Sequence, residues 1–207
     1  MKVLLVNGSP NEHGCTDMAL SIVGETLRAC GVETEVFWIG RKPIGGCMAC
    51  RACSKLGKCV QDDVVNEFTA KAKEADGFVF GSPVHYAALS GNLTAFMDRA
   101  FYSCGRDTFR LKPAAGILSA RRAGTTAAFD QINKYFTINQ MPVVSSRYWN
   151  MVHGSVAEDV LKDEEGVACM RILGKNMAWL LKCLEAGKAQ GILPPEQEAV
   201  VRTNFIR

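Results

Sequence analysis

Short apolar runs and longer amphipathic stretches alternate along the chain of 207 residues. Short runs that are apolar throughout are typical of strands buried on both faces of a sheet, whereas apolar positions three and four apart indicate one buried face of a helix. The pattern predicts five strands, at residues 2–6, 33–39, 77–81, 114–119 and 142–145. It predicts helices at 16–30, 62–74, 93–101 and 127–138, and a last helix at 170–184.

Strands that alternate with helices in this way predict an α/β fold, with a parallel sheet covered by helices on both faces. With right-handed crossovers, the five strands favour the doubly wound order 2-1-3-4-5. In that order ligands bind at the carboxyl ends of the strands. We expect residues 1–188 to form a single domain, with a cysteine-rich insertion at 45–60, and residues 189–207 to form a C-terminal tail.

Charge and hydropathy narrow the possible partners. The 24 basic and 21 acidic residues leave a formal net charge of +3, too small a surplus to indicate nucleic acid or an anionic membrane surface. No apolar run approaches the ~20 residues that span a bilayer. The first apolar run, ended by Asn7 and Gly8, is too short for the core of a signal peptide. We therefore expect a cytoplasmic protein that binds neither nucleic acid nor membrane.

The loop after the first strand, residues 7–16, carries donors suited to a phosphate group. Its glycines let backbone amides approach an anion, and Ser9 and Thr16 add hydroxyl groups. The helix that follows adds free N–H groups and the positive end of its dipole. The loop matches neither G-x-G-x-x-G nor a Walker motif, and it contains no Lys or Arg, which favours a phosphate monoester over a triphosphate with magnesium. The alternative is an ordinary turn followed by a helix cap.

The loops after the third and fourth strands carry a second set of candidates. In the first of them, Pro83 stiffens the chain, and His85 and Tyr86 can present flat rings beside a planar ligand. In the second, Arg121 and Arg122 can stabilise a negative charge. The alternatives are a strand-to-helix loop with a half-buried tyrosine and a pair of solvated arginines.

Two paired motifs carry a resemblance to a known family. Gly8-Ser9-Pro10 and Gly14-Cys15-Thr16, together with Gly81-Ser82-Pro83-Val84-His85-Tyr86, resemble the NAD(P)H-dependent FMN reductases of the flavodoxin-like class, and so does Phe96-Met97-Asp98-Arg99. The resemblance covers residues 1–145. It implies a flavodoxin-like fold whose 1–188 domain binds FMN. It implies that the phosphate is surrounded by Ser9, Asn11, Cys15 and Thr16, that the isoalloxazine is lined by Pro83, Val84, His85 and Tyr86, and that its other edge meets Ser119, Ala120, Arg121 and Gly124.

Four of the nine cysteines form the pattern C-x2-C-x2-C-x5-C: Cys47, Cys50, Cys53 and Cys59. Three cysteines at this spacing bring their sulfurs round one compact turn, and the fourth returns through a loop. Four thiolates can hold a 4Fe-4S cluster or a tetrahedral zinc ion. A cysteine-rich loop that packs near the flavin or a partner subunit is the remaining alternative. The run resembles the compact motif of the iron–sulfur flavoproteins, which implies a unit near the FMN.

These features favour an FMN-dependent oxidoreductase that uses NAD(P)H as a transient co-substrate and reduces flavin, quinone or a similar acceptor. FMN supplies the chemistry, so no catalytic side chain is assigned. One alternative is an iron–sulfur flavoprotein that transfers electrons, and another is a zinc-stapled, non-redox interaction module. The expected partners are a small-molecule acceptor or redox carrier and a second copy of the chain. In such a homodimer, the aromatic loop at residues 147–154 and the tail would cover the edge of the ring.

Overall fold

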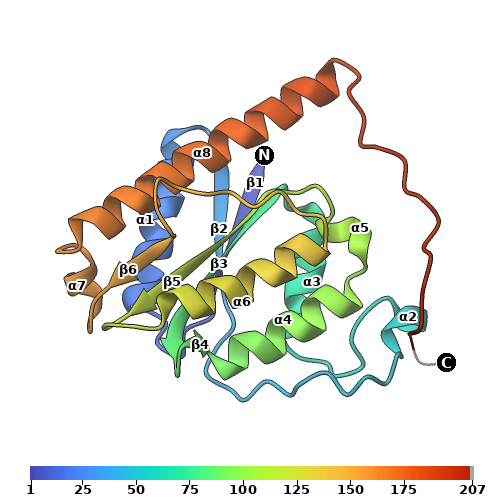
Figure 1. Ribbon diagram of the computed structural model, residues 1–207, viewed down its shortest axis with the longest axis horizontal. Helices are drawn as coiled ribbons and strands as arrows, with labels where there is room; N and C mark the ends of the chain where they lie inside the picture. Colours follow the sequence, from blue (N-terminus) through green and yellow to red (C-terminus); the bar gives the residue numbers. More distant parts are fainter. Residues whose placement is uncertain (206–207) are drawn as a thin grey trace.

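The computed structural model describes residues 1–205, apart from the side chain of Arg106. Its main sheet is parallel, in the order β2-β1-β3-β5-β6 (Figure 1). The strands are β1 (Lys2–Asn7), β2 (Glu33–Trp38), β3 (Gly77–His85), β5 (Ala114–Ala120) and β6 (Met151–His153). A two-residue strand, β4 (Ala88–Leu89), pairs antiparallel with the end of β3. The predicted doubly wound fold is confirmed.

Helices cover both faces of this sheet. One face is covered by α1 (Cys15–Ala29), α7 (Ala157–Val160) and α8 (Glu164–Ala189). The other is covered by α3 (Val64–Glu74), α4 (Gly91–Ser103), α5 (Arg106–Phe109) and α6 (Thr125–Ile138), while the short α2 (Cys53–Leu56) lies in the cysteine-rich insertion. Alternation along β1 explains the two layers, because successive side chains of a strand point to opposite faces. Val3 and Leu5 pack with the first layer, and Leu4 and Val6 pack with the second.

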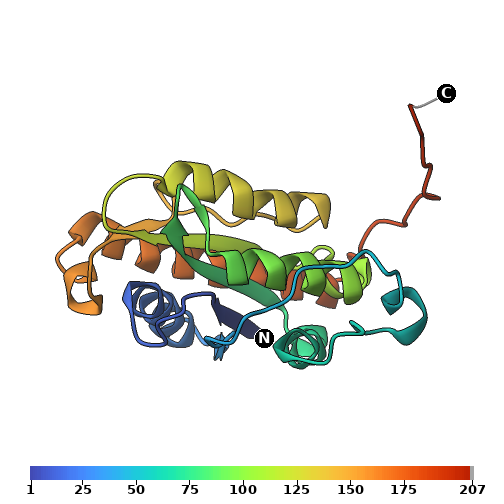
Figure 2. The same ribbon diagram turned by 90° about the horizontal axis from the view of Figure 1, so that it is seen from below.

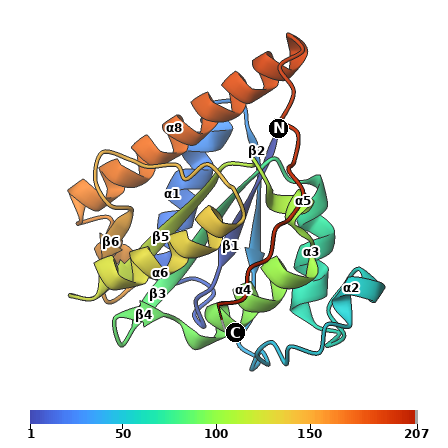
Figure 3. The same cartoon turned by 45° about the vertical axis from the view of Figure 1, so that its right-hand side comes forward.

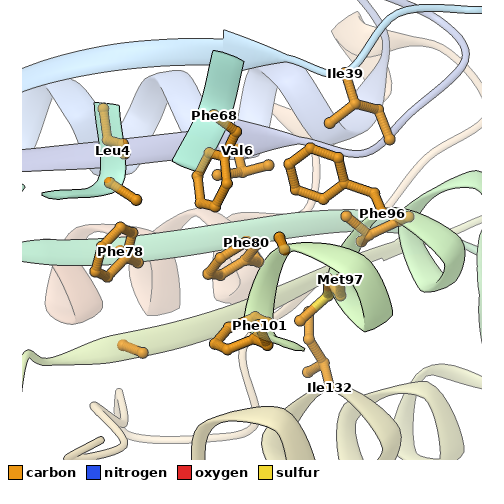
Figure 4. Close-up of a cluster of buried hydrophobic side chains, with 14 of the residues drawn as sticks. Leu4, Val6, Ile39, Phe68, Phe78, Phe80, Phe96, Met97, Phe101 and Ile132 are labelled. Carbon is orange, nitrogen blue, oxygen red and sulfur yellow. The ribbon is translucent and has the colours of Figure 1, made fainter. Parts of the chain in front are cut away.

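An aromatic cluster fixes α3 and α4 on the sheet (Figure 4). Phe68 of α3 and Phe96 of α4 are fully buried, with ring centroids 5.1 Å apart. Phe68 also meets Phe78 and Phe80 of β3, at centroid distances of 6.3 and 5.9 Å. Burying each such ring stabilises the fold by roughly 1.5–3 kcal/mol. The position of α4 against the sheet is therefore set by the core.

The fifth strand is not where the hydrophobic pattern predicts it. Within 142–145, only Val143 makes a parallel bridge, to Ala114 at the start of β5. The regular strand is β6, which pairs with Leu118–Ala120 at the other end of β5. Both runs are too short for β-propensity to separate them, and hydrogen bonding to β5 decides which one forms the strand. The correction places residues 154–158 at the carboxyl edge of the sheet.

After Ala189 the chain has no regular secondary structure up to residue 205. This tail leaves the end of α8, passes in front of α5 and α4 in Figure 3, and projects away from the folded body in Figure 2. Arg110 Nη2 donates to the carbonyl of Pro195 at 2.8 Å. Several apolar side chains of the tail are exposed: Ile192, Leu193, Val200, Val201 and Phe205. No helix in the described part of the chain is both long and apolar enough to cross a membrane.

Candidate functional site

A cleft of about 600 Å³ opens at the carboxyl ends of β1, β3, β5 and β6. Most of the predicted cofactor residues line it together: Ser9, Asn11, Cys15, Thr16, Pro83, Val84, His85, Ser119, Ala120 and Arg121. They come from three loops far apart in the sequence, which meet because parallel strands end at the same edge. Tyr86 and Gly124 are not among the residues that line the cleft.

The loop after β1 forms a cradle of amides and hydroxyls. Ser9 is buried, its Oγ accepts from the amide of Asn11 at 3.0 Å, and its carbonyl accepts from Trp38 Nε1 at 2.8 Å. Helix α1 begins at Cys15, and the glycine before it, Gly14, has no side chain with which to cap the first turn. The amides of that turn, at the positive end of the helix, are therefore available to an anion. This arrangement fits a phosphate ester.

A buried hydroxyl pair joins this cradle to the end of β5. Thr16 Oγ1 and Ser119 Oγ lie 2.8 Å apart, and both residues are buried. Beside them, burial raises the pKa of the Cys15 thiol, a backbone hydrogen bond partly offsets the rise, and the carboxylates of Asp159 and Glu158 add to it. The thiol is therefore neutral near pH 7, so Cys15 contributes no negative charge that would repel a phosphate.

Of the two predicted residues that do not line the cleft, Tyr86 lies in the turn between β3 and β4 and Gly124 lies at the start of α6. Tyr86 and Ala87 have φ values of +51° and +59° and make the tight turn between β3 and β4. Tyr86 is fully exposed at the tip of that turn. Gly124 has a φ of +97°, and a Cβ on it would lie 2.9 Å from the Cα of Ala87. Gly124 thus lets the start of α6 pack directly against the hairpin.

Apart from Glu12 and His13 of the loop after β1, two sets of cleft residues were not predicted as cofactor contacts. Arg41 lines the cleft, and its Nε donates to the carbonyl of Pro10 at 2.8 Å, so a cation stands beside a phosphate loop that contains none. The available signal was its position just after the second strand, on the same sheet edge. Residues 154–158 also line the cleft. They were missed because the fifth strand was assigned too early in the chain.

The four clustered cysteines line a second, smaller cavity, between the insertion and α4. Cys47 and Cys50 are exposed, and Cys53 and Cys59 are half-buried. Among the described residues, the two cavities share no lining residue. In Figure 1, α2 of the insertion lies at the right of the molecule, and β6 and α7 of the first cleft lie at the left. Within a single chain, the four cysteines therefore do not lie beside the first cleft, contrary to the expectation from the sequence.

The backbone of the insertion takes unusual conformations on both sides of Cys50. Ala49 and Arg51, which flank Cys50, have φ values of +53° and +58°. Such values are costly for residues other than glycine and cluster at functional sites. As the side chains stand within residues 1–205, no three His, Cys, Asp or Glu residues are grouped as a metal site. The shared cavity and its four thiols nevertheless fit a sulfur-ligated group, since thiolates are the ligands of iron–sulfur clusters.

Comparison with known proteins agrees with this geometry. The sequence model of the NADPH-dependent FMN reductase family matches residues 1–155. The chain belongs to this family. An iron–sulfur flavoprotein of Methanocaldococcus jannaschii is 33% identical over 197 residues, which are 89% of this chain and 100% of that protein. One from Archaeoglobus fulgidus is 30% identical over 190 residues, which are 87% of this chain and 97% of that protein.

Solved structures with low sequence identity share the fold. A flavone reductase superimposes with a TM-score of 0.69 at 17% identity, over 89% of this chain and 64% of that chain. A flavodoxin from the domain Archaea gives a TM-score of 0.58, also at 17% identity, over 88% of this chain and 99% of that chain. Family membership makes the chain part of a flavin-binding oxidoreductase family, and the resemblance found in its motifs is confirmed.

Proposed function

We propose that this chain binds FMN in the first cleft, oxidises NAD(P)H, and reduces a small acceptor such as a flavin or a quinone. The observation that carries the proposal is the uncapped start of α1 beside the buried hydroxyls of Ser9 and Thr16. Arg41 adds a positive charge next to them. Together these groups suit the phosphate of FMN, and the loops after β3 and β5 suit its ring.

When bound, FMN supplies the hydride and electron chemistry. The chain supplies binding and orientation. Ser9, Asn11 and the first amides of α1 hold the phosphate. Pro83, Val84 and His85 border one side of the ring, and Ser119, Ala120 and Arg121 border the other. The charge of Arg121 favours an anionic ligand at that edge.

Binding of FMN and riboflavin to the flavin-free chain tests the phosphate assignment, because riboflavin lacks the phosphate. We expect FMN to bind at least tenfold more tightly in a fluorescence titration. Equal affinities would refute the assignment. Oxidation of NADPH and NADH is then followed with the FMN-loaded chain and a quinone. FMN binding without oxidation of either nucleotide would refute the reductase proposal and leave the site assignment standing.

A second candidate is an iron–sulfur flavoprotein that transfers single electrons. It is favoured by the cavity that collects Cys47, Cys50, Cys53 and Cys59, and by relatives that carry the iron–sulfur name. Anaerobic reconstitution with iron and sulfide, followed by iron analysis and visible absorbance, tests it against zinc. Wild type should take up stoichiometric iron, and a Cys50→Ser variant should not. In a parallel reconstitution with zinc alone, stoichiometric zinc uptake by a chain that takes up no iron would favour the zinc-stapled alternative.

We also propose that the chain is a cytoplasmic homodimer. The tail projects from the body with several exposed apolar side chains, and Tyr148 and Trp149 are half exposed at the β6 end of the sheet. Such surfaces favour contact with a second copy. Mass measurement in solution at micromolar concentration should give a dimer, and removal of residues 190–207 should weaken it. A monomeric full-length chain would refute this proposal.

A further inference from the structure

One turn apart on α4, Arg99 and Ser103 both line the cysteine cavity. Arg99 is only 1% exposed and is the largest fully buried side chain among the described residues. A buried cation is unfavourable unless it is paired and hydrogen-bonded. Its partners therefore show what this face of α4 is built to hold.

The five N–H donors of Arg99 all have partners around the insertion. Nε donates to Sγ of Cys59 at 3.3 Å. Nη1 and Nη2 bind the two carboxylate oxygens of Asp63 at 2.7 and 2.9 Å. The remaining donors reach the carbonyls of Gly45, at 3.3 Å, and Gln61, at 2.9 Å. Gly45 precedes the first clustered cysteine and Gln61 follows the last, so one side chain joins both ends of the insertion.

Cys59 is held more firmly than Cys47 and Cys50. Its backbone amide donates to Asn66 Oδ1, and its carbonyl accepts from Asn66 Nδ2, both at 3.0 Å. Asn66 belongs to α3, which the aromatic core seats on the sheet. Arg99 fixes the sulfur of the same residue. Cys59 is thus anchored by two helices, while Cys47 and Cys50 are exposed.

Ser103 provides an independent observation. Its Oγ is buried, and no atom of the described residues forms a hydrogen bond with it. An unsatisfied buried hydroxyl destabilises a folded chain, so each such group calls for an explanation. Here the residue borders the cavity that the cysteines also line. An acceptor within that cavity would satisfy it.

We propose that Arg99 and Ser103 are positioning residues for an iron–sulfur cluster on the four cysteines, Arg99 through Sγ of Cys59 and Ser103 by donating to a sulfur of the cluster. The inference rests on the iron–sulfur candidate above. Hydrogen bonds to cluster sulfurs favour the more negative, reduced state and so raise the reduction potential. This face of α4 therefore both retains the cluster and makes it easier to reduce.

The test uses full-length chains reconstituted anaerobically with iron and sulfide: wild type, R99K, S103A and a control, T94V. Thr94 lies on the same helix, and its hydroxyl bonds to the carbonyl of Ser90, away from the cavity. We expect S103A to keep its iron. At a fixed redox poise, its ratio of reduced to oxidised cluster should fall about tenfold, a shift of about 59 mV for one electron. R99K keeps the positive charge but loses the planar guanidinium with its five N–H donors. It should therefore retain less iron than wild type.

A merely structural role for Ser103 predicts a different pattern. Without a cluster, S103A removes an unsatisfied hydroxyl, so the apo variant should melt at or above the temperature of the apo wild type. A lower potential in a variant that is no less stable cannot come from misfolding. T94V should match wild type in iron content and potential, and FMN affinity should be unchanged in every variant.

Two results would overturn the proposal. If S103A has the wild-type potential and R99K has the wild-type iron content, the α4 face does not act on the cluster. If wild type takes up no iron, the inference and the iron–sulfur candidate both fail, while FMN binding and NAD(P)H oxidation still stand or fall by their own assays. Loss of FMN binding with normal iron uptake would count against the reductase proposal alone.

Discussion

The two cavities are organised by different physical means. The first cleft is built on the ends of regular strands, where the amide of Gly8 donates to the carbonyl of Gly81 at 2.9 Å and β1 pairs with β3 through Asn7. The second is formed by an insertion whose only regular element is the four-residue α2. It depends on Arg99, which reaches across from α4 to both ends of the loop. A sheet edge places ligands by strand register, whereas a loop needs a buried side chain to hold it.

Among these substitutions, removal of Arg99 should lower the free energy of unfolding the most. Arg99→Ala empties a fully buried position and breaks an ion pair, so we expect it to lower the free energy of unfolding by about 3 kcal/mol. Asp63 is partly exposed, which lets water compensate some of the loss. Urea unfolding measures the change, and Asp63→Asn, which keeps one of the two acceptor oxygens and leaves Arg99 in place, should cost less than Arg99→Ala. Equal stability of Arg99→Ala and wild type would mean that the arginine does not secure the loop.

Gly8, in the first cleft, and Gly46, in the cysteine-rich insertion, differ in how closely they are packed. A Cβ on Gly8 would lie 2.7 Å from Leu93 Cδ2 and 2.8 Å from the carbonyl of Gly81, whereas one on Gly46 meets no described atom within 4 Å. Gly8→Ala should therefore lower stability by about 1–3 kcal/mol through overpacking and weaken FMN binding. Gly46→Ala should stay within about 0.5 kcal/mol of wild type. Thermal melts and flavin titrations would contradict the comparison if the two variants behaved alike.

The hydroxyl pair in the cleft should have a smaller effect, on affinity. Thr16→Val removes a buried hydroxyl that shares a hydrogen bond with Ser119 and lines the cleft. We expect FMN binding to weaken by about 1–2 kcal/mol, read from fluorescence quenching. Thr137→Val is a suitable control, because the hydroxyl of Thr137 bonds to its own helix at an exposed position. An unchanged FMN affinity in Thr16→Val would remove Thr16 from the phosphate site.

Rates of thiol alkylation compare the two cavities without any substitution. The thiolate is the reactive form, so the raised pKa of Cys15 leaves less of it at about pH 8. In the apo chain, iodoacetamide should therefore modify the exposed Cys47 and Cys50 before Cys15, as judged by peptide mass spectrometry. FMN should slow the reaction of Cys15 further, because Cys15 lines the cleft. Reaction of Cys15 at the same rate as Cys47 would contradict the neutral, half-buried thiol.

Hydrophobic patterning was sufficient for the fold, and the loop motifs with the family resemblance they carry indicated most of the cleft. A parallel sheet aligns the carboxyl ends of its strands, so loops recognised one by one could be expected to meet. Asp63 caps α3, accepting from the amide of Val65 at 3.1 Å, next to the start of the helix expected at residues 62–74. The prediction failed at the fifth strand, where neighbouring short runs are alike locally and only their pairing with β5 separates them. That error hid residues 154–158 of the cleft.

The sequence by itself determined the alternation of elements and the spacing of the four cysteines, because each depends on near neighbours along the chain. The sheet order followed from that alternation together with the right-handed crossover rule. Only the tertiary structure decided what surrounds those cysteines. Arg99 is 40 residues from Cys59 and 54 from Gly45 along the chain. The motif Phe96-Met97-Asp98-Arg99 marks it as part of the family resemblance, but no local pattern shows that its side chain is buried or which groups it contacts. Its burial follows from the aromatic core that seats α4 on the sheet. Long-range packing selects such contacts, and local periodicity carries no record of them.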